Sequence, residues 1–141
     1  MKRSMNSMIL TAAATLTMGV SAAYGQPALR ADIPFSFHAG GKTLPPGQYR
    51  VGQSGVVTGT NIVTLSNTQE SVMVMSNHAV YRSSSERIPV KMTFSCTDAK
   101  GCALAEIWDG SNVTAFSTPK ISPADRERIA TVRLTSPATG Q

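Results

Sequence analysis

Several features that would assign the chain to a large class of proteins are missing from its sequence. Its main apolar run, Met8–Val20, has 13 residues, whereas a membrane-spanning helix needs roughly 20. The two histidines, His38 and His78, stand far apart and outside any metal-ligand spacing. We therefore expect a soluble mature protein without a histidine-based metal site.

Catalytic motifs are missing too. Gly52-Gln53-Ser54-Gly55 falls short of a G-x-S-x-G nucleophile elbow because the next glycine is replaced by Val56. No glycine-rich phosphate loop ending in Lys-Ser or Lys-Thr occurs. These absences favour a non-enzymatic protein with no catalytic residues and no cofactor.

The charge content is low, at 15% of the chain. Glycine and proline are frequent, with 11 and 8 residues, and the 141 residues suit one domain. This composition is typical of turn-rich, β-rich exported domains rather than helical bundles. No basic stripe with interleaved aromatic residues is visible, so nucleic-acid binding is not expected.

The N-terminus reads as a secretory signal peptide. Lys2 and Arg3 form a basic start, Met8–Val20 the apolar region, and Ala23-Tyr24-Gly25 a small-residue cleavage site. The alternative, a membrane anchor, is disfavoured because the apolar run is too short. We expect cleavage after Gly25, which lowers the net charge from +5 to +3, and a secreted or periplasmic protein.

Both cysteines, Cys96 and Cys102, lie in the exported part, where oxidation is favoured. We predict that they form a disulfide. The closed loop is short, so the crosslink should contribute about 2 kcal/mol in the chain-entropy model.

The segments on either side of this loop predict a β-hairpin. Ile88–Cys96 has the clearest period of two in the chain, Thr97–Gly101 is a loop containing glycine, and Cys102–Trp108 returns.

Pairing Cys96 with Cys102 would place Phe94 opposite Leu104 but Met92 opposite Glu106. Three solutions are open for a carboxylate on the core face: Glu106 is buried and paired, a bulge shifts the register, or the face is partly covered. A bulge is the commoner solution.

The N-terminal part of the mature chain predicts a second strand–turn–strand unit. Asp32–His38 alternates apolar and polar residues, Leu44–Gly47 is a turn, and Gln48–Gln53 resumes as a strand. Pro34 cannot donate to a ladder, so it favours an edge position or a late entry into the sheet.

The remaining strands are short. Ser71–Met75 is apolar on both faces and is therefore placed in the middle of a sheet. Tyr81–Arg87 is polar and has no glycine or proline to fix its conformation, so we expect a flexible loop there. For the C-terminus, a helix starting at Ser122 is one alternative; we favour a flexible tail because few apolar residues would anchor it.

We therefore expect an all-β fold, an antiparallel β-sandwich or open barrel of about seven to eight short strands. The expected boundaries are a helical signal peptide at 1–25, a leader at 26–31, the β-domain at 32–119 and a flexible tail at 120–141.

Two segments, residues 31–51 and 91–110, resemble an uncharacterised group of small exported proteins abundant in Acidobacteria. The shared pattern is aliphatic-Pro-Phe-x-Phe, then G-K-x-L-P-x-G-x-Y, and later a Phe-containing strand, a loop and Glu-Ile-Trp. The matching residues are Ile33, Pro34, Phe35, Phe37, Gly41, Lys42, Leu44, Pro45, Gly47, Tyr49, Phe94, Glu106, Ile107 and Trp108. The resemblance implies export and a β-rich fold and carries no activity. Leu44–Tyr49 is also similar to a turn of prealbumin-like surface modules, which are structural or adhesive β-sandwiches.

Glu106, Trp108 and Tyr81 are the candidate ligand-facing residues, because an aromatic surface beside a carboxylate suits a shallow carbohydrate or peptide site. The alternative is a half-exposed sheet face with no ligand.

Met73 and Met75 alternate on one face, with Met92 and His78 as possible neighbours, and thioethers suit Cu(I). Methionine as core filler is the favoured alternative, so no metal ligand is assigned.

The function expected from these features is binding or scaffolding at the cell envelope, with an envelope protein or polysaccharide as partner. A small-ligand or copper carrier in the periplasm is the alternative.

Overall fold

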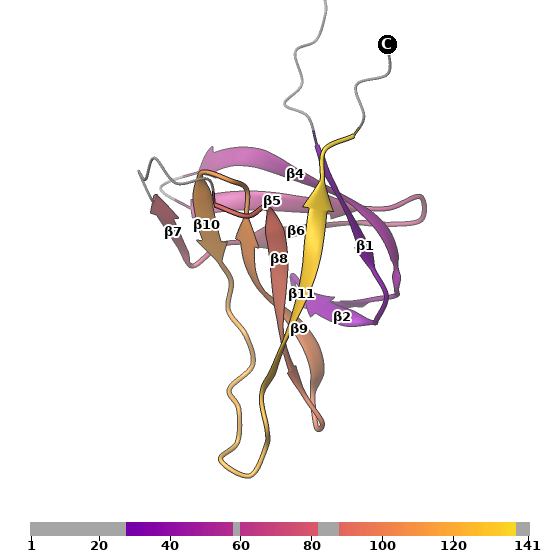
Figure 1. Ribbon diagram of the computed structural model, residues 1–141, viewed down its shortest axis with the longest axis vertical. Helices are drawn as coiled ribbons and strands as arrows, with labels where there is room; N and C mark the ends of the chain where they lie inside the picture. Colours follow the sequence, from indigo (N-terminus) through magenta and orange to yellow (C-terminus); the bar gives the residue numbers. More distant parts are fainter. Residues whose placement is uncertain (1–27, 58–59, 82–87, 138–141) are drawn as a thin grey trace, which may run out of the picture.

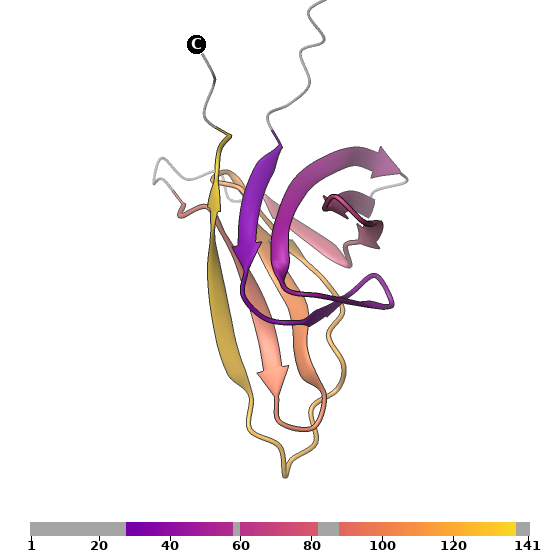
Figure 2. The same ribbon diagram turned by 90° about the vertical axis from the view of Figure 1, so that its right-hand side faces the viewer.

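The computed structural model describes residues 28–57, 60–81 and 88–137, and for 54–57 and 78–81 its backbone only. In these ranges the chain forms eleven strands and no helix, all joined in one sheet that is nearly closed into a barrel (Figures 1 and 2). The strands are β1 (Leu29–Ile33), β2 (Phe37–Ala39), β3 (Lys42–Leu44), β4 (Gly47–Val57), β5 (Thr60–Ser66), β6 (Ser71–Met75), β7 (His78–Tyr81), β8 (Lys91–Thr97), β9 (Gly101–Trp108), β10 (Asn112–Ala115) and β11 (Arg128–Thr135). The all-β prediction is confirmed, but the expectation of about seven to eight strands, all antiparallel, is wrong, because in these ranges the sheet has eleven strands and one parallel pair. The expected signal peptide lies outside the described residues.

The sheet is mixed. Its main path runs β3-β2-β9-β8-β11-β1-β4-β5-β6, and β10 adds to β9 and carries β7. Only the β2–β9 pair among these is parallel. The β6 end of this path approaches the other half of the sheet, because Asn77 N–H, just after β6, donates to the Ala115 carbonyl of β10 at 3.0 Å.

An aromatic cluster occupies the barrel interior. Phe37 packs edge-to-face against Phe94 and Tyr49, each with ring centroids 5.3 Å apart, and Phe35 lies 5.1 Å from Phe94. The Tyr49 hydroxyl donates to the Pro45 carbonyl at 2.6 Å, which ties the Pro-Pro-Gly turn to the core. Burial raises the pKa of the Tyr49 phenol, so the group stays neutral and can keep donating.

The predicted strand Asp32–His38 is divided in two. β1 ends at Ile33, β2 begins at Phe37, and Pro34 lies in the bend between them. The edge position expected for this strand is wrong, because β1 pairs with β11 on one side and with β4 on the other. Pro34 is tolerated because it follows the last ladder residue.

The C-terminal boundary is the largest correction. Residues 128–135, expected in a flexible tail or a helix, form β11, which pairs with β8 and β1. The tail hypothesis overlooked a period of two: Val132 and Leu134 are buried, while Arg133 and Thr135 between and after them are exposed. Similarly, the expected leader 26–31 overlaps β1, which begins at Leu29.

The strand Ser71–Met75 is confirmed, but its expected place inside the sheet is wrong. β6 ends the main path, and its Met73 and Met75 side chains are 68% and 70% exposed, because only the Val72 and Val74 face packs inward. The β2–β3 turn lies against this strand. A side chain at Gly40 would come within 2.7 Å of the Met73 carbonyl oxygen, and φ there is +56°, so glycine is required.

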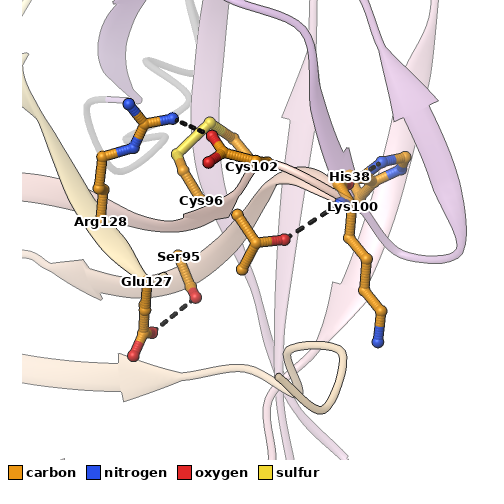
Figure 3. Close-up of a disulfide and its surroundings, with 9 residues drawn as sticks. His38, Ser95, Cys96, Lys100, Cys102, Glu127 and Arg128 are labelled. Carbon is orange, nitrogen blue, oxygen red and sulfur yellow. Dashed lines mark hydrogen bonds and ion pairs between the residues drawn. A yellow bond between two sulfur atoms is a disulfide. The ribbon is translucent and has the colours of Figure 1, made fainter. Parts of the chain in front are cut away.

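The predicted disulfide is present, and Cys96 and Cys102 face each other across β8 and β9 (Figure 3). Phe94 faces Leu104 as predicted. The register then shifts, and Ala105 is the extra residue, so that Met92 faces Ile107 and Glu106 faces Thr93. The bulge moves the Glu106 carboxylate off the core face, the commonest of the three expected solutions.

Replacing both cysteines by alanine should lower the free energy of unfolding by about 2 kcal/mol while the chain still folds. The seven residues from Cys96 to Cys102 restrict the unfolded chain only modestly, and the hairpin has its own ladder. Urea denaturation of the double variant, beside the wild type with and without reductant, measures this. Equal midpoints for all three, or a variant that fails to fold, would contradict the prediction.

Candidate functional site

A cavity of about 760 Å³ opens at the end of the barrel where β1 begins and β11 ends. Its size lies within the range of small-molecule sites. Its walls come from β1, β4, β5, β9, the segments flanking β8 and β11, and the β9–β10 turn. The lining residues are Ala28, Leu29, Val51, Gly52, Gln53, Val63, Val90, Ile107, Asp109, Ser111, Asn112 and Ser136.

The cavity walls are mainly aliphatic. Leu29 faces Val51 across β1 and β4, and Val63 on β5 and Ile107 on β9 are both almost fully buried. Each is the inward residue of an alternating strand, so the barrel itself holds these side chains in place. An apolar ligand body would replace water here.

One carboxylate, that of Asp109, stands among these apolar walls. Its Oδ1 accepts hydrogen bonds from the backbone N–H groups of Ser111 (2.8 Å) and Asn112 (2.7 Å). Its Oδ2 accepts from Gln53 Nε2 at 2.8 Å, and Asn112 Nδ2 lies 3.4 Å away. The turn Asp109-Gly110-Ser111-Asn112 is therefore closed by its own first side chain, with Gly110 at φ 98°.

These contacts set the ionisation of Asp109. Burial alone would raise the pKa of the carboxyl, but the donors from Asn112, Ser111 and Gln53 outweigh it and lower the pKa below its usual value. Asp109 thus places a negative charge in the cavity at neutral pH.

Acid should remove the stabilisation that Asp109 provides. Because its folded pKa is depressed, the contribution is complete above the unfolded value of about 3.9 and is lost as the pH falls through the folded pKa. The difference in unfolding free energy between wild type and Asp109→Asn should shrink from pH 7 to pH 2.5 in denaturation experiments.

The matched control for this experiment is Asp98→Asn, whose ion pair with Arg128 is 76% and 71% exposed on its two sides and should matter little. If the unfolding free energies of the wild type and Asp109→Asn differed by the same amount at pH 7 and pH 2.5, the assignment would be contradicted.

Two of the three residues predicted to face a ligand, Glu106 and Trp108, are not among the residues that line this cavity. Glu106 and Trp108 flank the buried Ile107 and therefore point to the outer face of β9, where Trp108 Nε1 donates to Glu106 Oε2 at 2.8 Å. Lys91 Nζ lies 4.4 Å from the Trp108 ring centroid. Tyr81 ends β7 and its backbone pairs with Asn112; its side chain lies outside the described part. The structure thus joins Glu106 and Trp108 as a half-exposed surface pair.

The methionines are separated by the fold. Met73 and Met75 are exposed on β6, whereas Met92 is fully buried in the core. The side chain of His78, the histidine expected near them, lies outside the described part. The other histidine, His38, contacts Thr43 Oγ1 at 2.9 Å and the Lys100 carbonyl at 3.1 Å. In the described ranges no group of three or more His, Cys, Asp or Glu residues could hold a metal ion.

Sequence reasoning missed Asp109 and Gln53 as site residues. Their side chains meet across 56 positions, so no local pattern joins them. The Asp-Gly-Ser-Asn sequence does signal a side-chain-closed turn, but nothing in it reveals that the barrel end opens beside it.

The comparisons add no family to this geometry: searches against protein-family models, curated proteins and solved structures find no significant match. Within residues 28–57, 60–81 and 88–137, no helix is long and apolar enough to cross a membrane.

Proposed function

We propose that this chain is an exported, non-enzymatic binding module whose small ligand enters the cavity at the open end of the barrel. The observation that carries the proposal is the combination of aliphatic walls with one ionised carboxylate, Asp109, in a cavity of about 760 Å³. Small-molecule sites are usually lined by apolar side chains, with a small number of polar groups that orient the ligand.

The charge of Asp109 indicates the ligand class. The hydrogen-bond donors that Asp109 has in the described part of the chain, from Gln53, Ser111 and Asn112, are neutral. In the described part of the chain the ion pair is between Arg128 and Asp98, so no cation neutralises Asp109 there. An amphipathic cation, with an ammonium group and an apolar body, would pair with the Asp109 carboxylate and cover the walls formed by Val51 and Val63.

Isothermal titration with decyltrimethylammonium tests this function. The wild type should bind it saturably, and Asp109→Asn should bind at least tenfold more weakly, a loss of about 1.4 kcal/mol. Decanoate, with the same chain length and the opposite charge, should bind less well than the cation. Absence of saturable binding, or equal affinity of the wild type for decyltrimethylammonium and decanoate, would contradict the proposal.

Export to the periplasm or the medium is the second part of the proposal. It is supported by the signal-peptide pattern at 1–25, by the disulfide, which suits an oxidising compartment, and by the resemblance to exported proteins of Acidobacteria. The partner at the envelope would be a protein or a polysaccharide. The intact mass of the secreted protein should correspond to residues 26–141 with one disulfide; a mass that includes residues 1–25 would contradict export by cleavage.

A further inference from the structure

The outer face of β1 and β4 carries a pair of like charges. Arg30 and Arg50 stand directly opposite each other in the antiparallel register, and both side chains are exposed. Directly opposed residues share a face with Cβ atoms roughly 5 Å apart, and like charges in this position destabilise a sheet. The Arg30–Arg50 pairing therefore lowers the stability of the fold as long as no anion lies between the two side chains.

Nothing in the described part of the chain compensates this pair by an ion pair. The ion pair there joins Arg128 to Asp98. Asp32 lies on the same face of β1 but stands opposite Gln48, and Glu70 follows the β5–β6 turn. Neither carboxylate is within ion-pair distance of Arg30 or Arg50.

The two arginines border a groove of about 360 Å³. Its other lining residues are Gln48, Tyr49, Ser66, Asn67 and Thr68, so residues with hydroxyl and amide groups share the groove with the two arginines. Across the sheet, Ser66 stands opposite Arg50 and Thr135 opposite Arg30. Two guanidinium groups that border one groove can bind a tetrahedral oxyanion through bidentate, charge-assisted hydrogen bonds.

This groove is distinct from the cavity at the barrel end. Leu29 and Val51 line the cavity, and their sequence neighbours, Arg30 and Arg50, line the groove. Because side chains alternate along a strand, the two sites lie on opposite faces of the same strand pair.

We propose that the Arg30–Arg50 groove is an oxyanion-binding site that takes the phosphate or sulfate group of an ester. The bound anion places its negative charge between the two guanidinium groups and removes their mutual repulsion. The proposal is independent of the ligand in the cavity, because it uses the other face of β1 and β4.

Thermal unfolding of the mature protein in sodium phosphate, sodium sulfate or sodium chloride at equal ionic strength tests the proposal, with glucose 6-phosphate titrated by calorimetry. The wild-type melting temperature should rise in phosphate or sulfate above its value in chloride. Arg30→Gln and Arg50→Gln should lose this rise and should bind glucose 6-phosphate at least tenfold more weakly than the wild type. The control Arg126→Gln, in the segment before β11, should behave as the wild type.

A second readout separates a binding pair from a merely structural one. In chloride, Arg50→Gln should melt at the same temperature as the wild type or higher, since the substitution removes a repulsion. A larger response to phosphate and glucose 6-phosphate assigns a phosphate ester, and a larger response to sulfate assigns a sulfate ester. No response of the wild type to either anion, an equal response in Arg30→Gln and Arg50→Gln, or a loss of stability of Arg50→Gln in chloride would overturn the proposal.

Discussion

Deletion of residues 128–141 should prevent the chain from folding. The deletion removes β11, which lies between β8 and β1 and joins the two halves of the sheet. Six residues of β11 face β8 and two face β1. Without it, both neighbouring strands gain open edges, and the core positions of Val132 and Leu134 are empty. Open strand edges also template association between chains.

Circular dichroism and size-exclusion chromatography measure this outcome: the truncated chain should show no cooperative thermal transition and should aggregate. The matched control is a chain ending at Pro137, which keeps all of β11 and should unfold as the full chain does. A cooperative transition for the chain ending at Glu127 would contradict the position of β11.

Phe94→Ala should cost about 4 kcal/mol of unfolding free energy, within the range for a buried phenylalanine. The Phe94 side chain is 0% exposed and packs edge-to-face with both Phe35 and Phe37. The substitution loses apolar burial, leaves a cavity in the centre of the barrel and removes two aromatic contacts. Since domains of this size are stable by about 5–15 kcal/mol, the variant should be marginal.

Denaturant unfolding of Phe94→Ala beside Ile129→Ala measures the effect. Ile129 is a large apolar residue on β11 that is 60% exposed, so its substitution should change stability by no more than about 0.5 kcal/mol. Similar losses for the two variants would contradict the assignment of the core to the Phe94 face.

Local patterns in the sequence predicted the β8–β9 hairpin well. The period of two, the glycine-containing loop and the cysteine pair together defined the register as far as Phe94, and the misplaced Glu106 signalled the bulge. All these signals act within 21 residues of chain, where turn geometry and side-chain alternation determine pairing.

Pairings between distant segments could not be predicted. β11 alternates buried apolar and exposed polar residues only over its second half, residues 132–135. The strands that pair with it, β8 and β1, end 31 and 95 residues before β11 begins. The same limit applies to the binding sites: Asp109 meets Gln53, and Arg30 meets Arg50, only through the sheet. The Arg30–Arg50 pair also leaves no local sequence signal, because the two arginines are 20 residues apart and form no charge cluster.

The proposed ligand cavity is tested most directly by titrating ¹⁵N-labelled protein with decyltrimethylammonium and following the backbone amide resonances. The account predicts saturable shifts that concentrate at Gly52, Gln53, Val63, Ile107 and Asp109, which line the cavity, while the amides around the Cys96–Cys102 disulfide stay unchanged. Shifts that do not saturate, or that concentrate at the exposed Met73 and Met75 of β6, would contradict binding in the barrel end.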